Sequence, residues 1–301
     1  MSRSYKTLIS ILLGLISFVG VFFASRFDFN GFSINITWSL MLPLLVALAW
    51  GIKYGVISVV ASPIIFYPFI LGSYNGWASL IPSLSLLFWI IIHGYGSEKR
   101  QKSNKLVYNL YLLQFIYVII RFVVYITLFP MFIRLNEVVT PFWNPQAYTE
   151  IEMGIVFLFV IKGIIVESIL LGFCDAALLL PFVREFFNLP ISSGARYNTY
   201  ILSGIVLLGL CFTFAVLAIY SYISTEISFF TWILNPTEEI RVTFLCAIIL
   251  FFIMGGITIR FVQRVVETQA QLRVRESQLE EALKDIQSLN EELEQRVLKR
   301  T

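Results

Sequence analysis

Four ionisable side chains lie inside long apolar stretches of the sequence and are the first candidates for chemistry. They are Arg121, Lys162, Glu167 and Asp175. An ionised side chain at the centre of a bilayer costs about 2.5–3.5 kcal/mol on insertion scales, so such residues usually pair with one another or bind something. We therefore predict a ligand site that includes Arg121, Lys162 and Glu167.

The spacing of these residues predicts which of them meet. Arg121 lies about 15 residues from the start of the apolar run 106–133, and Glu167 about 15 residues from the end of the run 152–182. At 1.5 Å per residue both lie at a similar depth, so we expect them to pair across neighbouring antiparallel helices. Lys162 precedes Glu167 by five residues, which is about 140° around a helix. It therefore needs another partner, such as an acidic group of a ligand.

A purely structural role for the pair stays open at this point. Arg121 and Glu167 would then only neutralise one another and fix helix packing. His93 and Asp175 would lie near the cytoplasmic interface, where they would reach water.

Other kinds of chemistry lack their motifs. The sequence has no Gly-rich phosphate loop, no HExxH motif and no GxSxG nucleophile context, so we predict no enzyme activity and no cofactor. His93 is the single histidine, and Cys174, Cys211 and Cys246 lie in apolar runs without CxxC spacing, so neither a metal site nor a disulfide is predicted. A net charge of +3 is too small and too scattered to indicate nucleic-acid binding.

The composition is that of a membrane protein. Of the 301 residues 58% are hydrophobic and 14% are charged, with a mean hydropathy of +0.81, whereas soluble domains carry about 25% charged residues. We predict an all-α fold, a polytopic bundle of membrane helices, because a helix of about 20 apolar residues spans the bilayer and satisfies its own backbone. About eight runs qualify: 6–25, 36–53, 54–72, 77–95, 106–133, 152–182, 198–222 and 240–262.

The loops indicate the topology. Basic residues gather at the N-terminus, with Arg3 and Lys6, and in the loop 97–105, whereas the loops on the other side are acidic or neutral. Cytoplasmic loops are rich in Lys and Arg, so both termini are predicted to be cytoplasmic, in the inner (plasma) membrane of the cell. The first run is interpreted as an uncleaved helix rather than a signal peptide.

Two outer segments, 134–151 and 223–239, are rich in aromatic residues, among them Trp143 and Trp232. One interpretation is an interfacial belt, where Trp and Tyr usually lie. The other is an ordered lid over a cavity. In that case Trp143 and Trp232 belong to the ligand site.

The pattern changes after residue 262, where more than a third of the 41 charged residues (22 basic and 19 acidic) lie. Apolar residues then recur with the heptad spacing of a coiled coil. We predict a membrane domain over 1–262 and a parallel dimeric coiled coil over 263–301. The predicted dimer contacts are Leu272, Leu279, Leu283, Ile286, Asn290, Leu293 and Val297. Asn290 in the seam favours a parallel pair in fixed register, and Arg275 can reach Glu280 of the other copy.

The tail from Leu289 to Thr301, LNEELEQRVLKRT, resembles the signalling helix that precedes the output domain in bacterial sensor histidine kinases and diguanylate cyclases. The membrane part is similar to the multi-helix sensor modules of those receptors, and the stretch from Phe32 to Gly55 is faintly similar to LytS-like and vitamin-carrier-like membrane domains. The resemblance implies a homodimeric sensor whose output domain, a kinase or cyclase, would follow Thr301 and is absent from this chain.

These observations predict a membrane-embedded input domain of a two-component-type receptor. An unknown small ligand or the state of the lipid bilayer would shift the last membrane helix, and the coiled coil would relay the change. Gly255 and Gly256 would supply either a bend or a close helix contact in that helix. The alternative is a dimeric small-solute transporter or channel with a coiled-coil tail, in which Arg121, Lys162 and Glu167 line the path.

Overall fold

The computed structural model describes all residues except 1, 30–31, 101–105, 191–194, 226–237 and 299–301. The chain divides into two compact units, Met1–Gly256 and Ile257–Thr301. The domains predicted over 1–262 and 263–301 remain a prediction.

The all-α expectation is confirmed, with one small addition. Strands β1 (Ser25–Phe29) and β2 (Phe32–Ile36) pair antiparallel, with Ser25 opposite Ile36, in a hairpin that follows the first helix. The remaining described elements are α-helices and short 3-10 helices.

The N-terminal helices form the centre of the larger unit. Its first elements are α1 (Arg3–Gly20), η1 (Val21–Phe23), η2 (Trp38–Leu40), α2 (Met41–Trp50) and α3 (Ile52–Val60). Seven of the ten residues of α2 are buried, because α1, α3, α5 and α7 all pack around it. Gly51, at φ 88°, ends α2 and lets the chain turn directly into α3.

The chain then breaks into short helical segments before the long helix α5 begins. These elements are η3 (Pro63–Phe66), α4 (Tyr67–Leu71), η4 (Ser73–Ser79) and α5 (Leu80–Arg100). Helix α3 and the segment Pro63–Leu71 are bent by 63° relative to each other. Pro63 has no N–H to continue the ladder, which accounts for the break.

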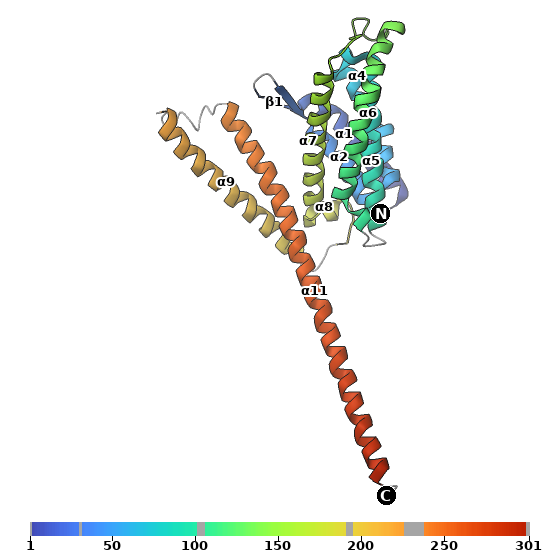
Figure 1. Ribbon diagram of the computed structural model, residues 1–301, viewed down its shortest axis with the longest axis vertical. Coiled ribbons are helices and arrows are strands. Elements are labelled where there is room, and N and C mark those ends of the chain that lie inside the picture. The colour runs from blue at the N-terminus through green and yellow to red at the C-terminus, as the bar shows by residue number, and fades with distance from the viewer. Residues whose placement is uncertain (1, 30–31, 101–105, 191–194, 226–237, 299–301) are drawn as a thin grey trace. The chain divides into compact units, whose positions relative to one another are not determined.

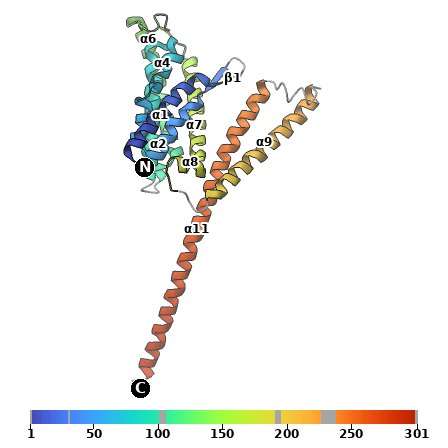
Figure 2. The ribbon, with the colours of Figure 1, turned by 180° about the vertical axis from the view of Figure 1, so that it is seen from behind.

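Three long helices lie side by side in this unit (Figure 1), and α1 and α2 lie in front of them when the molecule is seen from behind (Figure 2). The three long helices are α5, α6 (Leu110–Val138) and α7 (Met153–Ala177), with α6 in contact with both of the others. Asn109 begins α6 after η5 (Leu106–Tyr108), because its side chain accepts a hydrogen bond from the backbone N–H of Tyr111 at 2.9 Å.

The chain continues through α8 (Pro181–Phe186) and α9 (Ala195–Thr225) to α11 (Glu238–Leu298). Helix α11 is a single helix of 61 residues, and its first part, up to Gly256, belongs to the larger unit. No Pro or Gly follows Gly256 in the sequence, so nothing there interrupts the helix.

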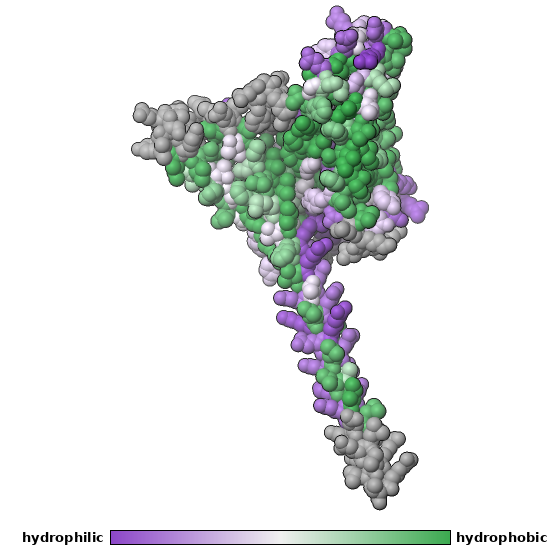
Figure 3. Space-filling model, in the orientation of Figure 1, coloured by the Kyte–Doolittle hydropathy of each residue, from purple (hydrophilic) through white to green (hydrophobic). Residues whose placement is uncertain are grey.

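The larger unit has the surface of a membrane-embedded protein. Hydrophobic residues cover most of its visible face (Figure 3). The apolar side chains of α6 that point away from the core, such as Phe115, Ile119 and Val123, are exposed. Such a surface is stable in lipid and would be costly in water.

The expected count of eight spans is not confirmed. Within the described residues six helices are long and apolar enough to cross a bilayer, and the bent pair Ile52–Val60 and Pro63–Leu71 adds at most a seventh. The run 36–53 yields only Trp38–Trp50, which is shorter than a span and is enclosed by other helices.

Candidate functional site

Helix α6 presents one buried stripe, and the candidate site lies in the middle of it. Apart from the adjacent pair Leu113 and Gln114, the buried residues follow one another at intervals of three or four, which is the repeat of one helix face. They are Leu110, Leu113, Gln114, Tyr117, Arg121, Tyr125, Phe129, Ile133 and Asn136. Gln114, Tyr117 and Arg121 of this stripe contact residues of α5 and α7.

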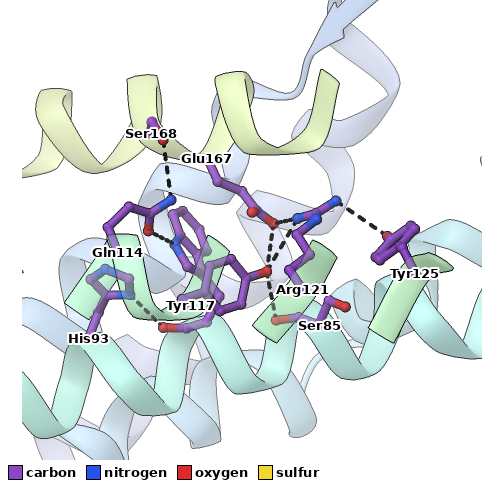
Figure 4. Close-up of polar contacts among 9 residues, drawn as sticks. Ser85, His93, Gln114, Tyr117, Arg121, Tyr125, Glu167 and Ser168 are labelled. Carbon is purple, nitrogen blue, oxygen red and sulfur yellow. Dashed lines mark hydrogen bonds and ion pairs between the residues drawn. The ribbon is translucent and has the colours of Figure 1, made fainter. Parts of the chain in front are cut away.

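Arg121 and Glu167 form the predicted ion pair. Nη1 of Arg121 contacts Oε1 of Glu167, across the interface between α6 and α7 (Figure 4). Both side chains are buried, with 7% and 9% of the residue surface exposed. Each charge therefore compensates the other where water cannot.

Two tyrosines complete the surroundings of the pair. The Tyr117 hydroxyl lies 3.1 Å from Oε1 of Glu167 and 3.3 Å from the backbone oxygen of Ser85, and it accepts from Nη1 of Arg121 at 3.2 Å. Nη2 of Arg121 donates to the Tyr125 hydroxyl at 3.3 Å, and the guanidinium lies 4.8 Å from the centre of that ring. Tyr67 of α4 also interacts electrostatically with the charges of the pair. We call Tyr117, Arg121, Tyr125 and Glu167 the arginine cluster.

Two buried polar atoms of the arginine cluster lack a hydrogen-bond partner within the described part of the chain. Among the described residues, neither Nε of Arg121 nor Oε2 of Glu167 has a hydrogen-bond partner, although both atoms are buried. A buried donor or acceptor without a partner costs about 1–3 kcal/mol, and more when it is charged. The cluster therefore offers one donor and one acceptor to a molecule that reaches it.

A second polar chain lies one to two turns away on the same stripe. Gln114 accepts from Nε1 of Trp89 at 2.9 Å and donates to the Ser168 hydroxyl at 3.3 Å. Nδ1 of His93 lies 2.8 Å from the backbone oxygen of Trp89. Polar contacts thus join α5, α6 and α7 along the interface (Figure 4).

Of the other predicted site residues that the structure describes, Lys162 lies on another side of α7 and Trp143 lies away from the pair. Lys162 is half-buried on α7, and helix geometry turns it about 140° from Glu167. Trp143 packs against Trp77, with ring centres 4.8 Å apart, and Nε1 of Trp77 donates to the backbone oxygen of Val139 at the far end of α6. Trp232 lies outside the described residues.

The segment after α6 is ordered where it meets η4. The side-chain amide of Asn136 donates to the backbone oxygens of Asn75 (3.0 Å) and Tyr148 (2.7 Å), and its oxygen accepts from the N–H of Trp77 at 2.9 Å. Asn136 is 15 residues beyond Arg121, which is about 22 Å along a helix. Trp143 therefore belongs to an aromatic cap at that end and not to the arginine cluster.

The expectation that His93 and Asp175 reach water is wrong. Their exposed fractions are 0% and 2%. Asp175 accepts a hydrogen bond from the Tyr111 hydroxyl at 3.0 Å, and His93 packs against Trp89. Both residues lie on the buried faces of their helices, His93 on α5 and Asp175 on α7.

Sequence reasoning missed the tyrosines of the arginine cluster. The signal was present, since Tyr117 and Tyr125 stand four residues on either side of Arg121 and Gln114 stands seven before it. These positions share one face of a helix. Ser85 and Ser168 carry no such signal, because they come from other helices.

The chain stands apart in three comparisons with known proteins. No protein-family model, no curated protein and no solved structure matches it.

Proposed function

We propose that this chain is the membrane-embedded input module of a homodimeric signalling receptor. A ligand or a lipid state would act on the membrane helices, and α11 would carry the change to an output domain after Thr301. The resemblance of the tail to the signalling helices of sensor kinases and cyclases supports this proposal, together with the features described next.

The observation that carries the proposal is an uncovered apolar stripe on a charged helix. Leu272, Leu279, Leu283 and Ile286 are 57–65% exposed on α11, and charged residues fill much of the rest of that segment. Leu residues at heptad spacing on a helix in water are stabilised when a second helix covers them. Asn290, Leu293 and Val297 extend the heptad pattern, and their side chains lie outside the described ones.

The occupant of the stripe that fits best is a second copy of this chain. In a parallel pair in register, every apolar seam position meets itself. Arg275 then lies within reach of Glu280 of the partner, and Asn290 meets Asn290 of the partner. A parallel homodimer would bring two output domains together.

The arginine cluster is the proposed input site, and its charge limits the ligand. The pair Arg121 and Glu167 carries no net charge, so a charged ligand would add an uncompensated charge among apolar helices, at a cost of several kcal/mol. An uncharged amphipathic molecule or a lipid group would instead use the free donor on Arg121 and the free acceptor on Glu167. Lys162, Trp143 and Trp232 would then contact the ligand, if at all, on its way to the cluster and not at the cluster itself.

Cysteine crosslinking tests the dimer. In a chain with Cys174→Ala, Cys211→Ser and Cys246→Ser, the variants Leu279→Cys and Ile286→Cys should each form disulfide-linked dimers in native membranes. Glu281→Cys is the matched control, because it lies on the outer face of the same heptad. Equal linking at all three positions, or none at Leu279→Cys and Ile286→Cys, would exclude the proposed coiled coil.

A fused output domain tests the signalling role. A kinase or cyclase joined after Thr301 should change its activity severalfold when Glu167→Gln is introduced, while Gly154→Ala on the same helix should leave it unchanged. An output that is indifferent to Glu167→Gln in a correctly inserted dimer would contradict the input role.

A transporter or channel is the second candidate, and the bent helix pair favours it. Helix α3 and Pro63–Leu71 diverge by 63°, and Tyr67 in the second segment lies near enough to the arginine cluster to sense its charges. Interrupted membrane helices near buried charges are typical of substrate sites in transporters. The full chain in proteoliposomes would then carry solute or ion flux that Glu167→Gln abolishes, whereas a sensor module would carry none.

A further inference from the structure

We infer that helix α7 is the lever that couples the arginine cluster to α11. This inference rests on the proposed function and names the path by which the input site would reach the relay helix. It follows from the way α7 divides its two faces.

One face of α7 holds the charge and the opposite face holds the relay helix. Gly172, Phe173 and Ala176 follow Glu167 by five, six and nine residues, which places them about 120–180° around the helix from it. Glu167 meets Arg121 of α6, whereas the other three meet α11. Helix α7 therefore lies between the ion pair and the relay helix.

The contact between α7 and α11 is close enough to transmit small movements. The rings of Phe173 and Phe252 stack, with centres 4.5 Å apart and planes 12° apart. A Cβ on Gly172 would lie 2.9 Å from two atoms of Ile253, and one on Gly256 would lie 2.8 Å from Cβ of Ala176. The two glycines thus let the helices come close where they cross, and close-packed groups transmit strain because they are hard to compress.

A second helix holds α11 on another side. Phe251 packs against Gly209 of α9, and Leu202 of α9 packs against Gly255. Because α11 also packs against α9, a shift of α7 would move α11 against this support. The close packing also decides between the two sequence interpretations of Gly255 and Gly256, because both glycines serve contact and α11 continues through them.

A ligand would act on α7 through the ion pair. A ligand that engages Oε2 of Glu167 or Nε of Arg121 would change the geometry of the ion pair, and α7 would shift or rotate relative to α6. Helix shifts of about 1–2 Å at interfaces are typical of such transitions. The same shift would reach Phe252, Ile253 and Gly256 through the opposite face.

Spin-label distances within one chain test the lever directly. The full chain in lipid nanodiscs would carry nitroxides at Ile161→Cys on α7 and Leu250→Cys on α11, two exposed positions, with the native cysteines replaced and labelled chains diluted by unlabelled ones. Glu167→Gln should shift the distance distribution by about 1–2 Å. Gly172→Ala should also shift it, without touching the ion pair.

Gly154→Ala is the matched control, because a Cβ at Gly154 meets nothing within 4 Å. It should leave the distribution unchanged. Tyr117→Phe, which removes one hydroxyl contact of Glu167, replaces Glu167→Gln if the latter does not fold. The lever is excluded if neither Glu167→Gln nor Tyr117→Phe shifts the distance distribution in the folded protein.

The dimer assay separates this inference from the proposed function. If the distances respond but Leu279→Cys forms no crosslink, α7 couples to α11 and the dimeric receptor is wrong. If Leu279→Cys crosslinks normally but the distances do not respond, the dimer stands and the lever is wrong.

Discussion

Gly163 of α7 lies directly against the guanidinium of Arg121, in the space where any other residue would place its Cβ. The bare backbone of α7 at this point lets the arginine side chain reach Glu167 one turn further along. The ion pair thus depends on a residue that carries no side chain.

Gly163→Ala should therefore weaken the arginine cluster. The added methyl group would displace the guanidinium, and overpacking of this kind costs about 1–3 kcal/mol. Unfolding of the purified protein in mixed micelles, followed by helical circular dichroism, measures the loss. Gly154→Ala on the same helix should cost much less, and equal losses for the two variants would contradict the contact.

The effects on stability of removing the Arg121 and Glu167 charges should not be additive. Removing one partner leaves a buried charge uncompensated, which typically costs 3–5 kcal/mol, so Glu167→Gln alone should destabilise strongly. The double variant Arg121→Gln and Glu167→Gln should recover much of that loss, because no charge remains. A double-mutant cycle on unfolding free energies measures the coupling, and additive effects would show that the pair is not formed in the membrane.

Asn136 should hold the aromatic cap in place. Its amide makes three hydrogen bonds to the backbone of Asn75, Trp77 and Tyr148, each worth about 0.5–1.5 kcal/mol. Asn136→Ala should speed proteolysis within 139–152 and lower stability by about 2–4 kcal/mol. Glu137→Ala, at an exposed neighbouring position, should do neither, and an unaltered cleavage rate in Asn136→Ala would count against the cap.

The turn between α2 and α3 should require glycine. Gly51 has φ 88° and lies against the Glu98 side chain, whose Oε1 accepts the N–H of Ile52 at 2.9 Å. A side chain at such a φ costs about 1–3 kcal/mol, so Gly51→Ala should lower the thermal midpoint of unfolding. Glu98→Gln, which keeps an acceptor, should cost less than Glu98→Ala. The same midpoint for these two would argue against the bond to Ile52.

Some of the architecture was predictable because helices in lipid obey simple rules. The apolar runs predicted the long helices, and the rise per residue predicted that Arg121 and Glu167 would meet. The tyrosines that surround them were readable in principle from the spacing around Arg121, since four residues return to the same helix face.

The membrane class, the long helices and the partner of Arg121 thus follow from the order of the amino acids, because hydrophobicity and helical rise act along the chain. Three features came from the folded helices alone: Trp38–Trp50 is a short helix enclosed by others, Tyr67 lies near the charges of the cluster on a bent segment, and Trp143 packs at the far end of α6. These features depend on which helices pack together, and packing joins residues that are distant in the chain and carry no shared period.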